Sequence, residues 1–548
     1  MTKLHPIIIE ILNRRGIIKE ADIDEFLSEK PQLTYDPFLL KNMREGVDFI
    51  LTAIKNDKSI CIYGDYDVDG ITGAALLVQV LRLLTGKVSW YIPSRMDEGY
   101  GLNKDALLSI AETGVQVVIT VDCGSVSVDE VKYGCELGLE MLVTDHHNTE
   151  GKIVDCLIIN PKQEGETYPF KSLSGCGVAF KIAQALTRDA GLPRQTLNDV
   201  LDLVGIATIA DVVPLVDENR TVTKYGLKTL RGTKRLGLRT LIRRTGLINQ
   251  EISSENVAYN IAPHLNSAGR MADARDVVDL LLTNDLGVAE RITEKLVEHN
   301  TRRKQLQEEI YDFCKGIAEY EICDDPIFVI NAGDAHEGIT GIVAGKLRER
   351  YYRPTLILTE TQGDGGVLKG TGRSVPGIDL FDLLKKHEDC FEKFGGHAMA
   401  CGFLLKADKE KQFRRDLIAD VNEMLERDKA LITLTLKPDA ELTTEMLNLE
   451  LVRELMKLAP FGNSNEVPLF VMKDLVIGSI VYMGDMGQHV KFDAGGISCI
   501  IFRNADDYFD ILVNGATVTI FGKPSIDLWN GRERLQFIVE KVINDAAH

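Results

Sequence analysis

The chain has 548 residues, which at roughly 150 residues per domain predicts three or four domains. Its apolar share of 45% and charged share of 26% are ordinary for globular proteins and exclude collagen-like, low-complexity and wholly disordered chains. The net charge of −19 argues against a general nucleic-acid coat, but it leaves room for a local basic groove.

The sequence carries few signs of membrane targeting, of secretion or of paired cysteines. We find no run of the ~18 uncharged apolar residues that a membrane helix needs, so we expect neither an anchor nor a signal peptide. The ten cysteines are scattered and form no C-x-x-C pair, which argues against a zinc ribbon or a disulfide scaffold. These features predict a soluble protein of the cytoplasm.

Residues 59–160 alternate β-branched runs with turns or helix-like stretches, which predicts an α/β domain with a parallel sheet. Three of these runs end at or beside a carboxylate, namely Asp65, Asp122 and Asp145. Because ligands gather at the carboxyl ends of parallel strands, we expect these acids to converge. The predicted strands are 59–63, 115–121, 141–144 and 157–159.

The rest of the chain divides into a helical part, a second α/β part and a β part. Residues 177–320 are predicted to be helical, and 288–313 carry apolar residues at helical spacing, from Val288 to Phe313, around a polar middle. We expect this helix to bridge two domains. A second α/β region should cover 326–406, then a charged helix, and the last ~115 residues should form a small β-barrel.

The segment Gly64–Gly70 places Asp65, Asp67 and Asp69 at alternate positions directly after a strand. Three acids this close repel one another unless a cation lies among them. A calcium loop would require a Glu where this sequence has Leu76. Solvated acids in a turn are the alternative to a metal site.

Asp145-His146-His147 adds imidazoles to carboxylates, the mixed set that binds Mn²⁺ or Zn²⁺. Adjacent residues of an extended segment point to opposite faces, so one histidine could bind a metal while the other faces a second metal, a substrate phosphate or the core. Asp122 and Asp211 are acids within apolar sequence, and a buried acid needs a partner. A helix cap or an internal salt bridge is the alternative for each.

The second α/β region contains Phe394-Gly395-Gly396-His397, whose glycines permit a close approach of backbone to a phosphate. Arg373 and Ser374 add a guanidinium fork and a hydroxyl, which suit a terminal phosphate. Arg95, after a strand on the acidic edge, is a further candidate. For the segment Phe394–His397, the alternative to a phosphate contact is a tight turn with a buried histidine.

Two features predict contacts with a nucleic acid. Residues 219–250 hold nine basic residues and no acid, which predicts a basic stripe, unless the stripe is an ordinary solvated face. Aromatic residues of the barrel could stack on single-stranded bases, although most should be core, and we select Trp529 as an exposed platform. The barrel aromatics considered are Tyr482, Phe492, Phe502, Phe521, Trp529 and Phe537.

Together these motifs resemble the DHH phosphoesterase superfamily, and within it the RecJ family of exonucleases, over essentially the whole chain. The sequence departs from the family pattern at Cys123, where Asn is usual, and at His264, where Arg is usual. The ordered motifs are GDYDVDG (64–70), IPSRMDEGYGL (92–102), VDCG (121–124), TDHH (144–147), SGCGVAFK (174–181), IADVVPL (209–215), APHLNSAGR (262–270), GRS (372–374) and FGGHAMACG (394–402).

The resemblance implies a cofactor of two Mn²⁺ or Mg²⁺ ions, with Asp122 bridging them. One ion is assigned Asp69, Asp122, His146 and Asp211, and the other is assigned Asp65, Asp67 and Asp122. Asp145, His147 and His397 are the remaining catalytic candidates. The implied substrate contacts are Arg95, Asn266, Arg270, Arg373, Ser374, Gly395, Gly396 and Trp529.

The implied architecture is multi-domain α/β. A DHH catalytic domain with an N-terminal segment (1–215) precedes a helical region with the interdomain helix (216–320), a DHHA1 domain (321–428) and an OB-fold (429–548). The implied activity is 5′→3′ hydrolysis of single-stranded DNA to 5′-mononucleotides in repair and recombination. The expected protein is a monomer that binds single-stranded DNA with a 5′ end and works with a single-strand-binding protein and a RecQ-type helicase.

Two other functions compete with this interpretation. A phosphoesterase for short oligonucleotides or nucleoside phosphates would leave the last ~115 residues unexplained, and a metal-free scaffold would lack ligands that are present here. We expect the C-terminal barrel to contribute substrate grip and no part of the chemistry.

Overall fold

The computed structural model describes residues 4–95, 98–149, 151–361, 366–484, 487–529 and 531–545. The chain forms two compact units, each assembled from separated parts of the sequence. Unit 1 contains Met1–Pro93, Tyr100–Ala262 and Leu436–His548, and unit 2 contains Ser94–Gly99 and Pro263–Thr435.

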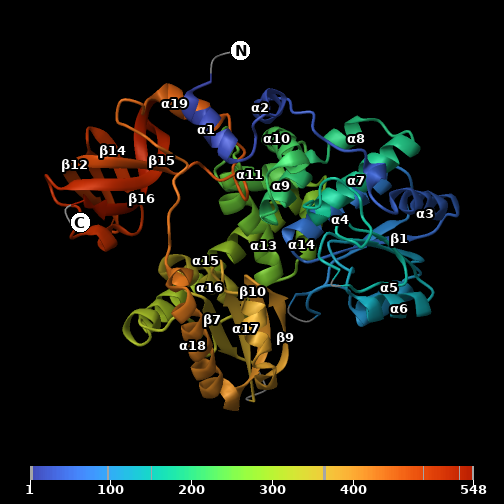
Figure 1. Ribbon diagram of the computed structural model, residues 1–548. Coiled ribbons are helices and arrows are strands. Elements are labelled where there is room, and N and C mark those ends of the chain that lie inside the picture. Colours follow the sequence, from blue (N-terminus) through green and yellow to red (C-terminus); the bar gives the residue numbers. More distant parts are fainter. Residues whose placement is uncertain are drawn as a thin grey trace. The chain divides into compact units, whose positions relative to one another are not determined.

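The first half of unit 1 is built on a five-stranded parallel sheet of order β2-β1-β3-β4-β5, which confirms the predicted sheet (Figure 1). Its central strands are buried on both faces, which explains why their sequences contain no charged residue. Helices α3, α4 and α7 cover one face and α5 and α6 the other (Figure 1). The strands are β1 (Ile60–Gly64), β2 (Val88–Tyr91), β3 (Val117–Val121), β4 (Glu140–Thr144) and β5 (Leu157–Ile159), and the helices are α3 (Met43–Lys55), α4 (Val68–Leu81), α5 (Lys104–Glu112), α6 (Val128–Glu136) and α7 (Gly175–Asp189).

The helical prediction for the region after the parallel sheet is confirmed. Helix α9 is apolar all round and almost wholly buried, and it packs against α4 and α10. Gly205 and Gly226 permit the contact between α9 and α10, because a Cβ on Gly205 would lie 2.9 Å from the Gly226 Cα. These helices are α8 (Gln195–Asn198), α9 (Leu201–Ala210), α10 (Asp217–Arg231), α11 (Leu236–Arg244) and α12 (Ser254–Asn256).

The C-terminal strands of unit 1 form the predicted barrel. Their order is β11-β12-β13-β14-β16-β15, and an additional pairing of β12 with β15 closes the sheet. The N-terminal helix α1 (Pro6–Arg14) buries Ile7, Ile8, Ile11 and Leu12 in the same core as the barrel strands. The other elements are α2 (Glu20–Leu27), β11 (Ala440–Glu441), α19 (Leu449–Met456), β12 (Phe470–Met483), β13 (His489–Ala494), β14 (Ile497–Ile501), β15 (Thr517–Trp529) and β16 (Arg532–Asn544).

Unit 2 contains the predicted second α/β region, a five-stranded sheet of order β6-β7-β8-β10-β9. Only β6 and β7 are parallel, and the other pairs are antiparallel. Its elements are α13 (Ala262–Met271), α14 (Arg275–Leu282), α15 (Leu286–Tyr320), β6 (Phe328–Asn331), α16 (Glu337–Tyr351), β7 (Thr355–Glu360), β8 (Val367–Arg373), α17 (Leu380–Lys385), β9 (Phe391–His397), β10 (Ala400–Lys406) and α18 (Glu410–Arg427).

The long helix α15 exists as predicted, and Ile292, Leu296 and Ile310 are buried as expected, whereas Phe313 is not. Phe313 is 55% exposed, while Ile310 and Cys314 carry the buried face. Within the polar middle, Asn300 and Arg303 are buried, whereas Thr301, Arg302, Lys304 and Gln305 are exposed. Arg303 donates to Asn300 Oδ1 at 3.0 and 3.1 Å and to Gln307 Oε1 at 2.8 Å, so each nitrogen of its buried guanidinium has an acceptor.

Among the described helices, none combines the length and the apolar character that crossing a membrane requires.

Candidate active site

The acids that follow the parallel strands converge as predicted. Asp65 follows β1, Asp122 follows β3 and the Asp145-His146-His147 segment follows β4. Asp211 joins them from the C-terminal end of α9. The side chains form three overlapping groups whose ligand atoms lie within 4.8 Å of one another: Asp65, Asp67 and Asp122; Asp69, His146 and Asp211; and Asp122, His146 and His147.

Asp122 lies at the centre of these groups. Its φ of +64° is in the left-handed region, where Asp is tolerated better than most residues. The first residue of α7, Gly175, approaches so closely that a Cβ there would lie 2.5 Å from the Asp122 Cβ. The glycine therefore lets the amino end of α7 reach the acidic edge, the edge of the sheet where Asp65, Asp67, Asp69, Asp122, His146, His147 and Asp211 gather.

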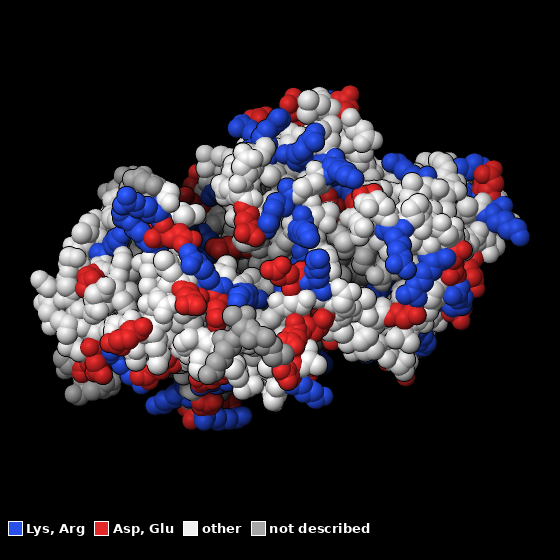
Figure 2. Space-filling model, turned by 90° about the horizontal axis from the view of Figure 1, so that it is seen from above, with Lys and Arg blue, Asp and Glu red and all other residues white. Residues whose placement is uncertain are grey.

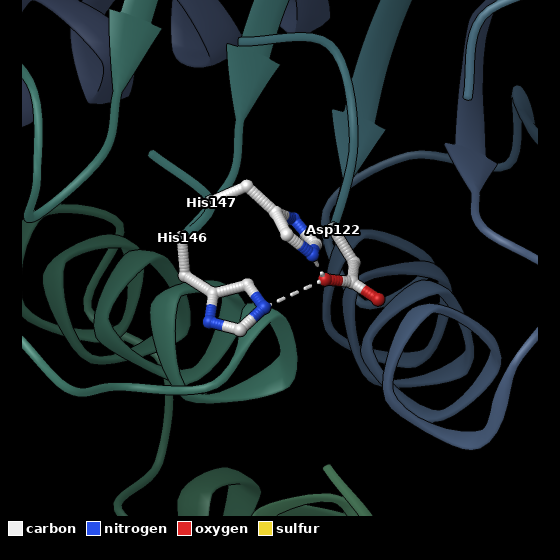
Figure 3. Close-up of side chains that lie close together, drawn as sticks. All are labelled: Asp122, His146 and His147. Carbon is white, nitrogen blue, oxygen red and sulfur yellow. Dashed lines mark ion pairs between the residues drawn. The ribbon is translucent and has the colours of Figure 1, made fainter. Parts of the chain in front are cut away.

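Both histidine rings point toward Asp122 (Figure 3). His146 Nε2 lies 3.0 Å and His147 Nδ1 3.7 Å from Asp122 Oδ1, and the two rings are 4.4 Å apart. The prediction that they face opposite sides is wrong. Both residues lie beyond the end of β4, where the alternation of a strand no longer applies.

His146 is held in one tautomer. Its Nδ1 lies 2.9 Å from the Leu173 carbonyl, to which it donates, and this leaves Nε2 as an acceptor beside Asp122. Burial is the main cause that lowers the pKa of His146, to about 3. A neutral imidazole with its second nitrogen bonded to a carbonyl is the usual form of a metal-ligating histidine.

Two of the clustered acids also stabilise helix ends. Asp69 accepts the amides of Gly175 and Cys176 at 2.6 and 2.9 Å, which ties α4 to the start of α7. Asp67 caps α4 by accepting the amides of Asp69 and Gly70 at 2.9 and 3.2 Å. Asp67 is therefore both a helix cap and a member of an acidic group.

The cluster fits divalent cations. Among the described residues, Asp65 Oδ1, Asp122 Oδ1, His146 Nε2 and Asp211 Oδ2 are buried without any hydrogen-bond partner, a costly arrangement unless a ligand satisfies them. Burial, and then the neighbouring carboxylates, raise the pKa of Asp65 and Asp122 well above the usual range. Cations among these oxygens would remove both penalties.

Asp145 contacts His147 rather than the acidic groups. Its Oδ1 accepts from His147 Nδ1 at 2.8 Å and its Oδ2 accepts the Ser125 amide at 3.0 Å. Burial alone would raise the pKa of Asp145, but the hydrogen bond from His147 and the charge of that ring lower it. The carboxylate therefore fixes the orientation of the ring.

Tyr100 belongs to the site and was missed from the sequence. Its hydroxyl lies 3.2 Å from His147 Nδ1 and 3.3 Å from the Asp122 carbonyl. A lone tyrosine in a Gly-rich loop carries no charge pattern, so only its place within the GYGL motif could have drawn attention to it.

Three arginines predicted to contact phosphate, Arg95, Arg270 and Arg373, belong to unit 2. Arg373 donates to the Gly372 carbonyl at 2.8 Å, and a Cβ on Gly341 of α16 would lie 3.0 Å from its Nη2. Arg270 donates to the Gly338 carbonyl, also on α16, at 2.8 Å. Burial, and then the charges of Arg348 and Arg95, lower the pKa of Arg373. Asn266 is half-buried on α13, the same helix as Arg270.

The other predicted contacts of this region differ among themselves. His397 is exposed at the end of β9, so the buried-histidine alternative is wrong. Gly396 has φ +140°, and a Cβ there would lie 2.4 Å from the Ala400 carbonyl oxygen, whereas Gly395 has open space. Ser374 is 1% exposed and donates to the Ile378 carbonyl at 2.7 Å, which does not support a phosphate contact. The side chain of Trp529 lies outside the described residues.

The predicted basic stripe is wrong for three of its nine members. Arg220 is 4% exposed and Lys224 half-buried, and both donate to backbone carbonyls, while Arg235 pairs with Asp202. Sequence spacing could not reveal these partners. Figure 2 shows basic and acidic side chains interspersed over the face in view. The exposed members are Lys228, Arg231, Lys234, Arg239, Arg243 and Arg244.

Cys123 and His264, the two residues that depart from the family pattern, both contact neighbouring groups. Cys123 is completely buried next to Asp122, and its carbonyl accepts from the Thr120 hydroxyl at 2.8 Å. His264 Nε2 lies 3.1 Å from Asn300 Nδ2, so this side chain contacts a buried polar residue of α15.

Comparisons with known proteins agree with this geometry. The chain matches the DHH family N-terminal domain over residues 59–208, the DHHA1 domain over 324–424 and the RecJ OB domain over 438–541.

Relatives match over most of their own length. The single-stranded-DNA-specific exonuclease RecJ of Bacillus subtilis is 37% identical over 98% of this chain and 67% of that protein, and RecJ of Salmonella typhimurium is 32% identical over 85% and 83%. The crystal structure of Thermus thermophilus RecJ with Mn²⁺ superposes with a TM-score of 0.84 at 27% identity, covering 99% of this chain and 76% of that one. The chain therefore belongs to the RecJ family of the DHH phosphoesterases.

Proposed function

We propose that this chain is a metal-dependent 5′→3′ exonuclease specific for single-stranded DNA, releasing 5′-mononucleotides in DNA repair and recombination. The observation that carries the proposal is the buried acidic edge of unit 1, where four ligand atoms lack a partner among the described residues. The family supports the substrate, because the relatives named above are single-stranded-DNA-specific exonucleases.

The residues that would hold the ions belong to the three groups. Following the family resemblance, Asp69, Asp122, His146 and Asp211 would hold one ion, and Asp65, Asp67 and Asp122 the other; the groups bring Asp69, His146 and Asp211 together, and His146 also contacts Asp122. Similar proteins have been solved with Mn²⁺ and with Mg²⁺, and a histidine ligand favours Mn²⁺. When bound, two such ions activate a water and neutralise charge on the attacking and leaving oxygens of a phosphodiester.

The protein's own contribution is orientation and charge. The Leu173 carbonyl holds the His146 ring with its free nitrogen toward Asp122. Asp145 holds the His147 ring, which is 40% exposed and can donate to a phosphate oxygen. Tyr100, a half-exposed residue, contacts the same ring through its hydroxyl, which donates to the Asp122 carbonyl.

Unit 2 supplies positive charge for the 5′ phosphate. Arg270 and Arg373 contact the first turns of α16, and Arg95 is near enough for its charge to act on Arg373. Guanidinium groups gathered in this way bind phosphate oxygens through forked donors. Asn266, His397, Gly395 and Gly396 remain proposed contacts of the same strand.

The barrel supplies aromatic surface for unpaired bases. Phe502 is 50% and Phe509 64% exposed, and Phe509 stacks on Tyr482 with ring centroids 5.0 Å apart. Phe492 and Phe537 are core residues instead. Base stacking on exposed rings is the means by which OB-folds hold single strands without regard to sequence.

A polarity assay tests the proposal. With Mn²⁺, a long single strand labelled at its 3′ end should shorten progressively from the 5′ end, while duplex DNA of the same sequence resists. A dinucleotide should be a poor substrate. Preference for the dinucleotide would instead favour the phosphoesterase for short oligonucleotides.

Several finer points stay predictions of the sequence. They are the domain boundaries, the cytoplasmic location, the monomeric state and the cooperation with a single-strand-binding protein and a RecQ-type helicase.

A further inference from the structure

The loop between α19 and β12 contacts the turn that carries Asp211. The side-chain nitrogen Nδ2 of Asn463 donates to the Val212 backbone carbonyl at 2.7 Å. The backbone amide of Leu215 donates to the backbone carbonyl of Asn463 at 2.8 Å. Gly462 lies directly against this turn, because a Cβ there would be 2.7 Å from Leu215 Cδ1. Asn463 thus holds both ends of the segment that follows Asp211.

The turn needs such support. Val212 has φ +58°, a left-handed conformation that β-branched residues rarely adopt. Its side chain is 64% exposed, so burial of that side chain does not hold the turn in place. A strained residue next to a functional group persists only when its surroundings fix it. The hydrogen bond from Asn463 is a contact of this kind.

The loop itself is held firmly. Asn465 is 1% exposed and donates to the carbonyls of Leu458 and Pro460 at 3.0 and 2.7 Å. Arg220 of α10 donates to the carbonyls of Leu458 and Ala459 at 2.9 and 2.8 Å. The loop is therefore pinned from within and from α10, and it can act as a rigid clamp.

We propose that Asn463 is a positioning residue, which holds the Val212 turn so that Asp211 presents its carboxylate to His146 and Asp69. This inference rests on the proposed function, since it concerns a proposed metal ligand. Asp211 Oδ2 lies 3.6 Å from His146 Nε2 and is one of the buried atoms without a partner. A tilt of the turn would move that oxygen out of the group.

The proposal revises the role expected for the C-terminal part of the chain. Removal of the barrel near Lys429 would also remove Asn463, so it should weaken metal binding in addition to DNA binding. The loop is thus a physical link between the chain segment that begins the barrel and the acidic edge.

The test measures Mn²⁺ binding without DNA, in the full-length protein, by the electron paramagnetic resonance signal of free Mn²⁺. Asn463→Ala should raise the dissociation constant of one ion about tenfold, the lower end for loss of an outer partner of a ligand. Asn463→Asp, of equal size but without the donor, should do the same. The matched control is Asn514→Ala, an exposed asparagine of the barrel, which should change nothing.

Turnover provides the second measurement. At an Mn²⁺ concentration near the wild-type dissociation constant, both Asn463 variants should lose kcat with little change of KM for single strands, and excess Mn²⁺ should restore kcat. Melting in EDTA reports whether the fold is intact. Wild-type Mn²⁺ affinity in Asn463→Ala would overturn the positioning role. Failure of the wild-type protein to bind Mn²⁺ at all would instead overturn the proposed function.

Discussion

The acidic edge of unit 1 and the arginine cluster of unit 2 (Arg95, Arg270 and Arg373) both hold partly or wholly buried charged groups of one sign, negative in the first and positive in the second. At the edge, burial and like charge raise the pKa of Asp65 and Asp122. In the cluster, burial and the neighbouring arginines lower the pKa of Arg373. Each site concentrates one sign of charge where solvent screens it poorly, so each is suited to a ligand of the opposite charge: cations in one and phosphate in the other.

The two sites differ in how well they are satisfied without a ligand. The acidic edge leaves four buried ligand atoms without a partner among the described residues. Arg373 and Arg270 each donate to a backbone carbonyl already. We therefore expect a bound cation to contribute to catalysis and to stability, whereas a bound phosphate should affect mainly affinity.

The largest effect should come from Asp122→Asn, which keeps the size of the side chain and tolerates the positive φ, but removes the shared negative charge. We expect kcat on single strands with Mn²⁺ to fall about a thousandfold or more, because metal stabilisation of charge is worth several kcal/mol. Melting in EDTA should match the wild type or exceed it, since one repelling charge is gone. Substantial remaining turnover would exclude a bridging role for Asp122.

The second effect concerns stability. Saturating Mn²⁺, at a hundred times its dissociation constant, should stabilise the wild-type protein by about 2.7 kcal/mol for each ion, through binding to the folded state alone. A melting series in Mn²⁺ and in EDTA measures the shift. Asp122→Asn is the control and should show a smaller rise. An equal rise in both proteins would mean that the ion binds elsewhere.

Loss of one guanidinium in unit 2 should have an intermediate effect. Arg373→Ala should raise KM for 5′-phosphorylated strands about thirtyfold, equivalent to about 2 kcal/mol for a charged hydrogen bond. Arg415→Ala, an exposed arginine on α18, is the matched control. Equal losses on phosphorylated and unphosphorylated strands would show that Arg373 does not contact that phosphate.

The smallest effect should come from the barrel. Phe502→Ala should weaken binding of long single strands about fivefold, close to 1 kcal/mol for one stacked base, and leave kcat at saturating DNA unchanged. Fluorescence anisotropy with a labelled oligonucleotide measures this loss. Leu528→Ala removes a side chain that is 71% exposed but not aromatic, so it separates stacking from general apolar contact. Equal losses in the two variants would argue against stacking.

Much of the acidic edge could be predicted because it is local in sequence. Asp65, Asp122 and Asp145 each follow an apolar strand, and strands of a parallel sheet end at one edge, so their convergence needs no other information. The His146–His147 pair failed the same reasoning, because the strand ends before it and the period of two no longer holds. Asp211 could be recognised as an acid in apolar sequence, but its place beside Asp69 and His146 was predicted only from the family resemblance.

The remaining features depend on contacts between distant parts of the chain. Spacing suggested that Arg220 and Lys224 lie on a charged surface, yet the fold buries or half-buries both against backbone carbonyls. Ser374 has the right chemistry for a phosphate, but its proton is donated to Ile378. A side chain's partner is chosen in three dimensions, and residue type reports only which partners are possible.

The sequence by itself determined the parallel sheet, the closed barrel, the long helix α15 and the acids at the strand ends, because period and strand-end position are local properties of a chain. Only the tertiary structure decided that both histidines face Asp122, that α1 completes the barrel core and that Asn463 holds the turn after Asp211. Asn463 and Val212 are 251 residues apart, and a hydrogen bond over that separation follows from packing, which no local pattern encodes.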